Sequence, residues 1–288
     1  MAARPIVAAT DGSEESLRAV DWAAREAVLR GAPLRIVSAA ALPPRMVGSR
    51  GQSQYETVSD VIRDASDAAL SAAAARAAKI AANLLIDTDH LAGPTAEAVT
   101  EAGSGALMLV VGSRGVGAFA AMILGSVSRY AATHAACPVV VVREETGAAR
   151  RQVGIGIGSA EGNEAALTFA FEEAALRQAS VVAIHAWHTP QVDIARAGQV
   201  PADAAADVFQ DEAARELEQL LERWREKYPG IPVSQDVVHG HPGRALAGLS
   251  ARADLVVLGR HPAHHGPGTV THAVLNHAHG PIATVPSS

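Results

Sequence analysis

The chain of 288 residues has little cysteine, few aromatic residues and no long apolar run. Cys137 is the one cysteine, which excludes an internal disulfide framework and a metal site built from several cysteines. Aromatic residues make up only 3% of the chain, so we expect a core built largely from Ala, Val, Leu and Ile. Because no apolar run reaches the roughly 18 residues of a membrane span and no signal peptide is recognisable, we expect a cytoplasmic protein without a membrane partner.

Common motifs of nucleotide-binding and hydrolytic enzymes are also missing. No Gly-x4-Gly-Lys-Ser/Thr is present, which excludes a P-loop NTPase, and no Gly-x-Ser-x-Gly or His-Glu-x-x-His indicates a serine hydrolase or a zinc protease. Gly154 and Gly156 begin a Gly-x-Gly run, but Ser159 stands where the third glycine of a dehydrogenase or flavoprotein fingerprint would fall. The net charge of −6 gives no reason to expect nucleic acid as a partner.

Short β-branched runs alternate with longer Ala-rich helical patterns along the whole chain, which is typical of βαβ units with a parallel sheet. The fold class is therefore α/β. Strands are predicted over residues 6–9, 34–39, 84–87, 107–112 and 139–142, and again over 153–157, 181–186, 233–238, 255–259 and 282–285. Helices are predicted over 15–30, 59–82, 95–102 and 126–136, and the longest helix of the second half spans 213–228.

The second half repeats the first. Arg25-Glu26-Ala27 stands 147 residues before Glu172-Glu173-Ala174, and Val111-Gly112 stands 147 before Leu258-Gly259. The offset then falls to 143, which pairs Gly125-Ser126 with Gly268-Thr269, so the second copy lacks four residues in one loop. We expect two doubly wound, five-stranded parallel-sheet domains, residues 1–145 and 151–288, joined by a polar linker.

A glycine pattern follows the fourth strand of the first copy. Its first part is Gly112-Ser113-Arg114-Gly115. After nine further residues, a predicted helix begins with Gly125-Ser126-Val127-Ser128. Glycines let the backbone approach a ligand closely, and the amide groups of a helix N-terminus attract anions. The pattern favours a phosphate site, although the glycines alone are also compatible with plain turns and Ser126 with an ordinary helix cap.

The first strand ends in Ala9-Thr10-Asp11-Gly12, directly before a predicted helix. In a parallel sheet, ligands bind beyond the carboxyl ends of the strands, where the strand order reverses, and the first and fourth strands flank that point. Asp11 is then placed to accept hydrogen bonds from ribose hydroxyls. The alternative is that Asp11 caps the helix that follows it.

These residues together resemble the universal stress protein family in its ATP-binding form, and the duplication is similar to its tandem two-domain members. The resemblance implies a Rossmann-like fold in each domain and bound ATP, with or without Mg²⁺. It also implies that the last strands, 139–142 and 282–285, pair as an internal dimer and that residues 42–59 form a lid, for which a flexible surface connection is the alternative. Association of two chains as a homodimer is a further expectation. The implied ATP contacts are Ala9 and Thr10 through the main chain, Asp11 on the ribose, Ala39 near the adenine, and Gly112, Arg114, Gly115, Gly125, Ser126, Val127 and Ser128 around the phosphates.

The second copy departs from this pattern. Gly158 stands in place of Asp11, and Pro262, which has no N–H, stands in place of Gly115. We therefore expect one functional site, in the first copy, and a degenerate one in the second. The resulting hypothesis is a stress-response regulator whose ATP occupancy changes the binding of a protein partner. A slow ATPase and a cyclic-nucleotide or AMP-binding protein are the alternatives; no residue offers itself as the catalytic base of an ATPase.

Overall fold

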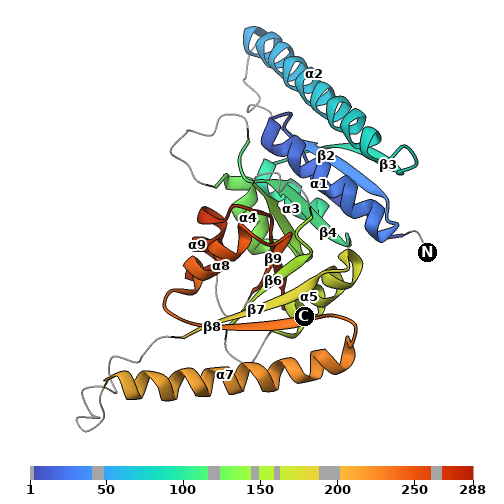
Figure 1. Cartoon of the computed structure of the whole chain (residues 1–288). Coiled ribbons are helices and arrows are strands. Elements are labelled where there is room, and N and C mark those ends of the chain that lie inside the picture. Colours follow the sequence, from blue (N-terminus) through green and yellow to red (C-terminus); the bar gives the residue numbers. More distant parts are fainter. Residues whose placement is uncertain are drawn as a thin grey trace. The chain divides into compact units, whose positions relative to one another are not determined.

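The computed structural model describes residues 3–40, 49–115, 124–143, 149–158, 163–187, 202–260 and 268–287 (Figure 1). Contacts divide the chain into two compact units, residues 1–145 (unit 1) and 146–288 (unit 2). Within the described residues, no helix combines the length and the apolar character needed to cross a bilayer.

Unit 1 is a parallel sheet in the order β3-β2-β1-β4-β5, so β1 lies between β2 and β4 as expected. The chain moves toward one edge from β1 to β3 and then crosses to β4, which makes the carboxyl ends of β1 and β4 the point of reversal. Its elements are β1 (Ile6–Ala9), α1 (Glu14–Arg30), β2 (Leu34–Ala39), α2 (Ser49–Ile80), β3 (Ile86–Leu91), α3 (Thr95–Ala102), β4 (Met108–Gly112), α4 (Ser126–His134) and β5 (Val139–Val142).

Unit 2 repeats this arrangement with parallel strands in the order β10-β9-β6-β7-β8, which confirms the duplicated α/β fold. Its elements are β6 (Gln152–Ile157), α5 (Glu164–Arg177), β7 (Ser180–Trp187), α7 (Ala202–Lys227), β8 (Val233–His239), α8 (Pro242–Ser250), β9 (Leu255–Arg260), α9 (Thr269–His277) and β10 (Ile282–Pro286).

The core of unit 1 is aliphatic. All residues of β4 and β5 are buried, as parallel strands covered on both faces require. Helix α1 contacts α2, and α3 contacts α4, so the four helices form two pairs. Ala19, Ala23 and Ala27 of α1 are fully buried, because small side chains let the helix lie close to the sheet.

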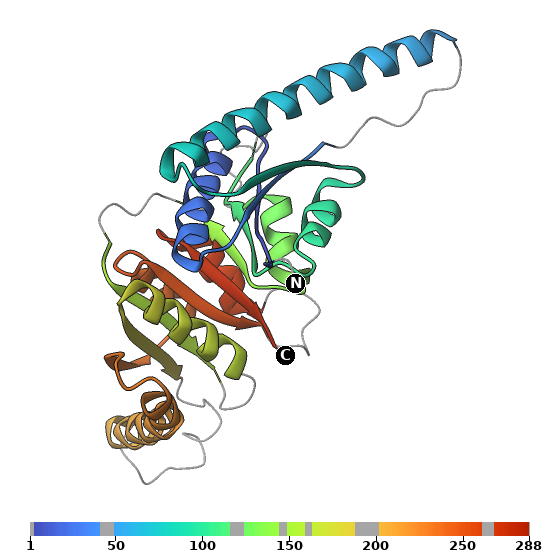
Figure 2. The same ribbon diagram turned by 90° about the vertical axis from the view of Figure 1, so that its right-hand side faces the viewer.

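Three boundaries differ from the sequence prediction: α7 begins at Ala202, eleven residues before the predicted start at 213, and two further differences lie in unit 1. The third strand, predicted at residues 84–87, is Ile86–Leu91, an edge strand whose residues 87–90 are polar and therefore lack a hydrophobic pattern. Helix α2 begins at Ser49, ten residues earlier than predicted, and Figure 2 shows it running past the end of the sheet. Residues 49–59 are thus helix and not a lid loop; residues 41–48 lie outside the described part.

A side chain at position 112 should strain the packing of α1 on β4. A Cβ built on Gly112 would lie 2.8 Å from the Glu15 carbonyl oxygen, whereas one on Gly125 would meet nothing closer than 3.5 Å. We expect Gly112→Ala to cost about 1–3 kcal/mol through overpacking, and Gly125→Ala less than about 1 kcal/mol. Native-state hydrogen exchange of the β4 amides measures both; equal protection in the two variants would contradict this packing constraint.

Candidate functional site

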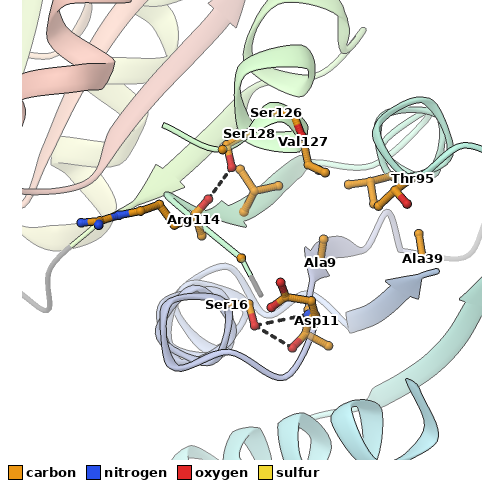
Figure 3. Close-up of a pocket in the computed structure, with 15 residues that line it drawn as sticks. Ala9, Asp11, Ser16, Ala39, Thr95, Arg114, Ser126, Val127 and Ser128 are labelled. Atoms are coloured by element: carbon orange, nitrogen blue, oxygen red, sulfur yellow. Dashed lines mark hydrogen bonds between the residues drawn. The ribbon is translucent and has the colours of Figure 1, made fainter. Parts of the chain in front are cut away.

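A cavity of about 480 Å³ lies at the carboxyl ends of β1, β2 and β4 (Figure 3). Its volume falls within the roughly 300–1,000 Å³ typical of small-molecule sites. All eleven residues named from the sequence line it, which brings together segments that are more than a hundred positions apart. The sequence analysis missed four further lining residues: Ser16, Thr95, Val99 and Val111. Thr95 begins α3, so the rule that ligands bind at the carboxyl edge could have drawn attention to it.

Asp11 projects its carboxylate into this cavity (Figure 3). Its Oδ1 accepts hydrogen bonds from the Ser13 backbone N–H at 3.0 Å and from the Ser13 hydroxyl at 2.6 Å. Ser13, not Asp11, is the N-cap of α1, because the Ser13 hydroxyl accepts from the Ser16 amide at 3.3 Å. The interpretation of Asp11 as the helix cap is therefore wrong: Asp11 orients the residue that caps the helix.

The glycines at positions 112, 115 and 125 differ in how much space surrounds them. Gly112 has no space for a side chain because the backbone of α1 lies against it, so the fold and not a ligand demands this glycine. Gly115 faces Asp11, and a Cβ there would lie 2.2 Å from Asp11 Oδ2. Gly125 has space for a Cβ and an ordinary φ of −68°, so neither packing nor backbone conformation explains it.

The first turn of α4 presents backbone amides to the cavity. Gly125 is the N-cap and makes no side-chain capping bond, so Ser126 begins the helix and does not cap it. The first hydrogen bond of this helix runs from the Arg129 amide to the Gly125 carbonyl at 3.0 Å. The amides of residues 126–128 precede that bond and are the groups that bind an anion at a helix N-terminus.

Ser128 and Arg114 have side-chain positions that the sequence could not show. The buried Ser128 hydroxyl donates to the Gly112 carbonyl, which uses its single proton and ties α4 to the end of β4. Ser128 is therefore not a side-chain donor to a ligand in this conformation. The guanidinium of Arg114 points away from the cavity, and its buried Nε has no hydrogen-bond partner within the described residues (Figure 3).

Unit 2 has a corresponding but smaller cavity of about 210 Å³. Most of its lining residues stand at the same offsets as those of unit 1, with Gly158 in place of Asp11. Leu246 replaces Val99 and Leu258 replaces Val111, and both leucines are buried. The larger side chains take up space that is open in unit 1, while Pro262 lies outside the described residues.

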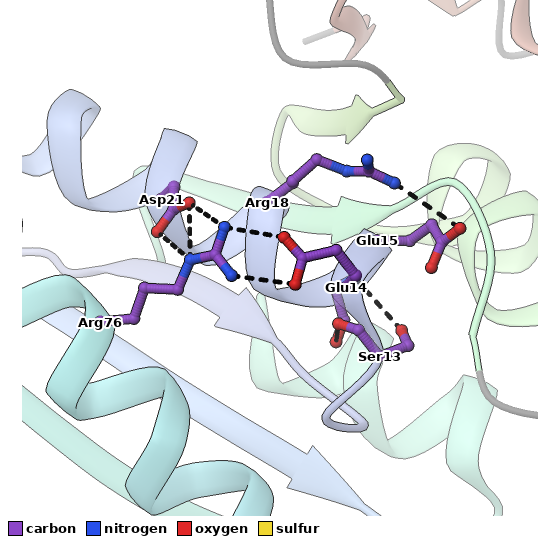
Figure 4. Close-up of polar contacts among 7 residues, drawn as sticks. Ser13, Glu14, Glu15, Arg18, Asp21 and Arg76 are labelled. Atoms are coloured by element: carbon purple, nitrogen blue, oxygen red, sulfur yellow. Dashed lines mark hydrogen bonds and ion pairs between the residues drawn. The ribbon is translucent and has the colours of Figure 1, made fainter.

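An ion-pair network that the sequence analysis missed supports the wall next to Asp11 (Figure 4). Arg76 of α2 donates to both carboxylate oxygens of Asp21, at 2.9 and 2.8 Å, and to those of Glu14, at 3.1 and 2.9 Å. Hydrogen bonds from Arg76 lower the pKa of Glu14, and the two carboxylates raise the pKa of Arg76. Because Glu14 follows Ser13 directly, Arg76 fixes the start of α1 and, through Ser13, the carboxylate of Asp11.

Comparisons with known proteins agree on one family. The model of the universal stress protein family matches residues 2–143 and again 149–286. The chain is 34% identical over 295 residues to a universal stress protein of Mycobacterium tuberculosis, covering 96% of this chain and 95% of the relative. It is 34% identical over 269 residues to one of Mycolicibacterium smegmatis, covering 89% and 86%. A crystal structure of a universal stress protein from Archaeoglobus fulgidus has the same fold, with a TM-score of 0.70, 17% identity and coverage of 100% of this chain and 97% of that one.

Removing Arg76 should return the Glu14 carboxyl to ordinary titration. In the wild type the lowered pKa means that the stabilisation by Glu14 is present above about pH 4.5 and is lost as the pH falls through the lowered folded-state value. In Arg76→Gln, an NMR titration of the Glu14 carboxyl should give a higher pKa than in the wild type. Arg129→Gln, at an exposed position of α4, serves as the control and should leave the Glu14 pKa low. An unchanged Glu14 pKa in Arg76→Gln would show that the network does not form in solution.

Proposed function

The chain belongs to the universal stress protein family, and we propose that it is a regulatory protein that binds one ATP in unit 1 and none in unit 2. The observation that carries the proposal is the unit 1 cavity, which combines a carboxylate on one wall with the open amides of a helix N-terminus on another. A nucleotide needs both: acceptors for its ribose hydroxyls and donors for its phosphates.

The order of the strands matches the order of the parts of ATP. Ala39 at the end of β2 would hold the adenine through its main chain, Asp11 after β1 the ribose, and the turn after β4 with the first turn of α4 the phosphates. Val99 and Val111 supply apolar surface to the same cavity. Mg²⁺, if bound, would be held mainly by the phosphates and water, as is usual for this ion.

Unit 2 lacks the partner for the sugar. Gly158 has no side chain to accept hydrogen bonds, and each such bond to a charged group contributes about 1–3 kcal/mol. This loss alone weakens binding by roughly 5- to 150-fold. The smaller cavity of unit 2 adds a steric cost for the base. We therefore propose that unit 2 has a structural or regulatory role, and that its last strand pairs with that of unit 1, as the family resemblance implies.

A double-mutant cycle can test the site. Because a Cβ at position 115 would collide with Asp11, Gly115→Ala should act by displacing that carboxylate. We expect Asp11→Ala and Gly115→Ala each to weaken ATP binding by about 5- to 150-fold, and the double variant to be little worse than either alone. Isothermal titration calorimetry with ATP gives the affinities, and the wild type should bind one ATP per chain.

Gly158→Ala is the matched control, since a Cβ there meets nothing within 4 Å and unit 2 is proposed to bind no ATP. It should leave both affinity and stoichiometry unchanged. Two ATP molecules per chain, or full affinity in both unit 1 variants, would contradict the assignment.

A regulatory role is favoured over ATP hydrolysis because the one carboxylate among the described cavity residues, Asp11, is assigned to the ribose, and the guanidinium of Arg114 points away from the cavity. We expect ATP incubated with the protein and Mg²⁺ for hours to be recovered without stoichiometric ADP, as measured by anion-exchange chromatography. Production of ADP that disappears in Asp11→Ala would instead support a slow ATPase. Displacement of ATP by equimolar cyclic AMP would support the cyclic-nucleotide alternative.

A further inference from the structure

Unit 1 contains a second cavity, of about 820 Å³, between α2 and the carboxyl ends of β2 and β3. It shares no lining residue with the cavity proposed for ATP. The neighbouring residues Ala39 and Ala40 line different cavities: Ala39 lines the cavity proposed for ATP, and Ala40 lines the second cavity. Its apolar wall includes Ala40 after β2, Ile62 on α2 and Ala92 after β3. Nothing in the proposed function makes use of this space.

The internal duplication shows what can fill it. The offset of 147 residues holds through this region, because α2 ends at Ile80 and α7 at Lys227, while β3 begins at Ile86 and β8 at Val233. Ala40, Ile62 and Ala92 therefore correspond to three residues with rings in unit 2: Trp187, Phe209 and His239.

Those three side chains pack together in unit 2. The ring centroid of Trp187 lies 4.5 Å from that of His239 and 6.2 Å from that of Phe209, and Trp187 is only 8% exposed. The same backbone frame thus holds an indole between two other rings in unit 2, whereas unit 1 offers two methyl groups and an isoleucine around an open space. The apolar wall of the unit 1 cavity is therefore suited to a ring supplied from outside, because covering this wall removes apolar surface from water.

Polar residues distinguish the two units at the same place. His90 hydrogen-bonds to Asp67 Oδ1 through Nε2 at 2.6 Å and to the Ser66 hydroxyl through Nδ1 at 3.0 Å. A carboxylate only accepts, so Nε2 carries a proton and donates it to Asp67. The positions of Ser66, Asp67 and His90 correspond to Ala213, Ala214 and Val237 in unit 2, where the same fold forms without polar groups.

Arg63 adds a positive charge at the rim. Its side chain is 65% exposed, and its contact with Asp60 is a long one of 3.4 Å at the surface, which contributes little. Gln210 occupies the corresponding position in unit 2. From the ring cluster that fills the corresponding place in unit 2 and from this cation, we infer that the cavity beneath α2 binds a planar aromatic or heteroaromatic molecule that carries an acidic group, with the ring between Ala40 and Ile62 and the anion toward Arg63.

Indole-3-acetate is a suitable probe because it combines the ring of Trp187 with a carboxylate. Ligand-observed NMR with the full chain should detect its binding both without ATP and with saturating ATP. Ala40→Trp, which copies unit 2, should weaken binding by at least about tenfold because it removes the buried ring area. The affinity for ATP should stay unchanged in this variant. Ile62→Phe adds a smaller ring to the same cavity and should also weaken binding of the probe. This variant tests the inference if Ala40→Trp does not fold.

Arg63→Gln distinguishes the contribution of the carboxylate to binding from that of the ring. It should reduce the affinity for indole-3-acetate to that for neutral indole, while binding of indole itself is retained. The inference is overturned if neither compound binds at millimolar concentration, if ATP displaces the probe, or if Ala40→Trp and Ile62→Phe leave its affinity unchanged. Binding of the probe in the absence of ATP does not depend on whether unit 1 binds ATP, and the affinity for ATP is measured separately in each variant, so the two proposals fail independently.

Discussion

The close approach of α1 to β4 is the constraint on which the candidate site depends. Position 112 has space only for glycine, because the backbone at Glu15 lies against it. This contact sets the start of α1 beside the turn after β4, which places Asp11 opposite Gly115. The Ser128 hydroxyl then ties α4 to the same strand end, so the helix amides and the carboxylate face one cavity. Packing that serves the fold thus also positions the groups proposed to bind a nucleotide.

The duplication separates the fold from the function. Both units have the same strand order, yet the cavity at the strand ends is about 480 Å³ in unit 1 and about 210 Å³ in unit 2. At this cavity unit 1 has Asp11 where unit 2 has Gly158, and beneath the long helices unit 1 has Ala40 where unit 2 has Trp187. Neither difference changes the order of the strands. One scaffold is therefore open at two places in unit 1 and partly filled at the corresponding places in unit 2.

Much of this arrangement could be predicted from the sequence, because buried parallel strands form continuous apolar runs and the doubly wound topology places the first strand beside the fourth. The gathering of Asp11 with the glycine turn follows from that order. What the sequence could not show depends on side-chain direction and on contacts between distant segments. The edge strand β3 has no apolar pattern, Arg114 points away from the cavity, and Arg76 reaches α1 from a helix whose start was placed ten residues too late.

The most direct test of the central claim is a crystal structure of the full chain grown with a non-hydrolysable ATP analogue. The account predicts electron density for one nucleotide, in unit 1, with its ribose at Asp11 and its phosphates at the amides of residues 126–128. A nucleotide located in unit 2, or one in unit 1 that leaves Asp11 and these amides without contact, would contradict it.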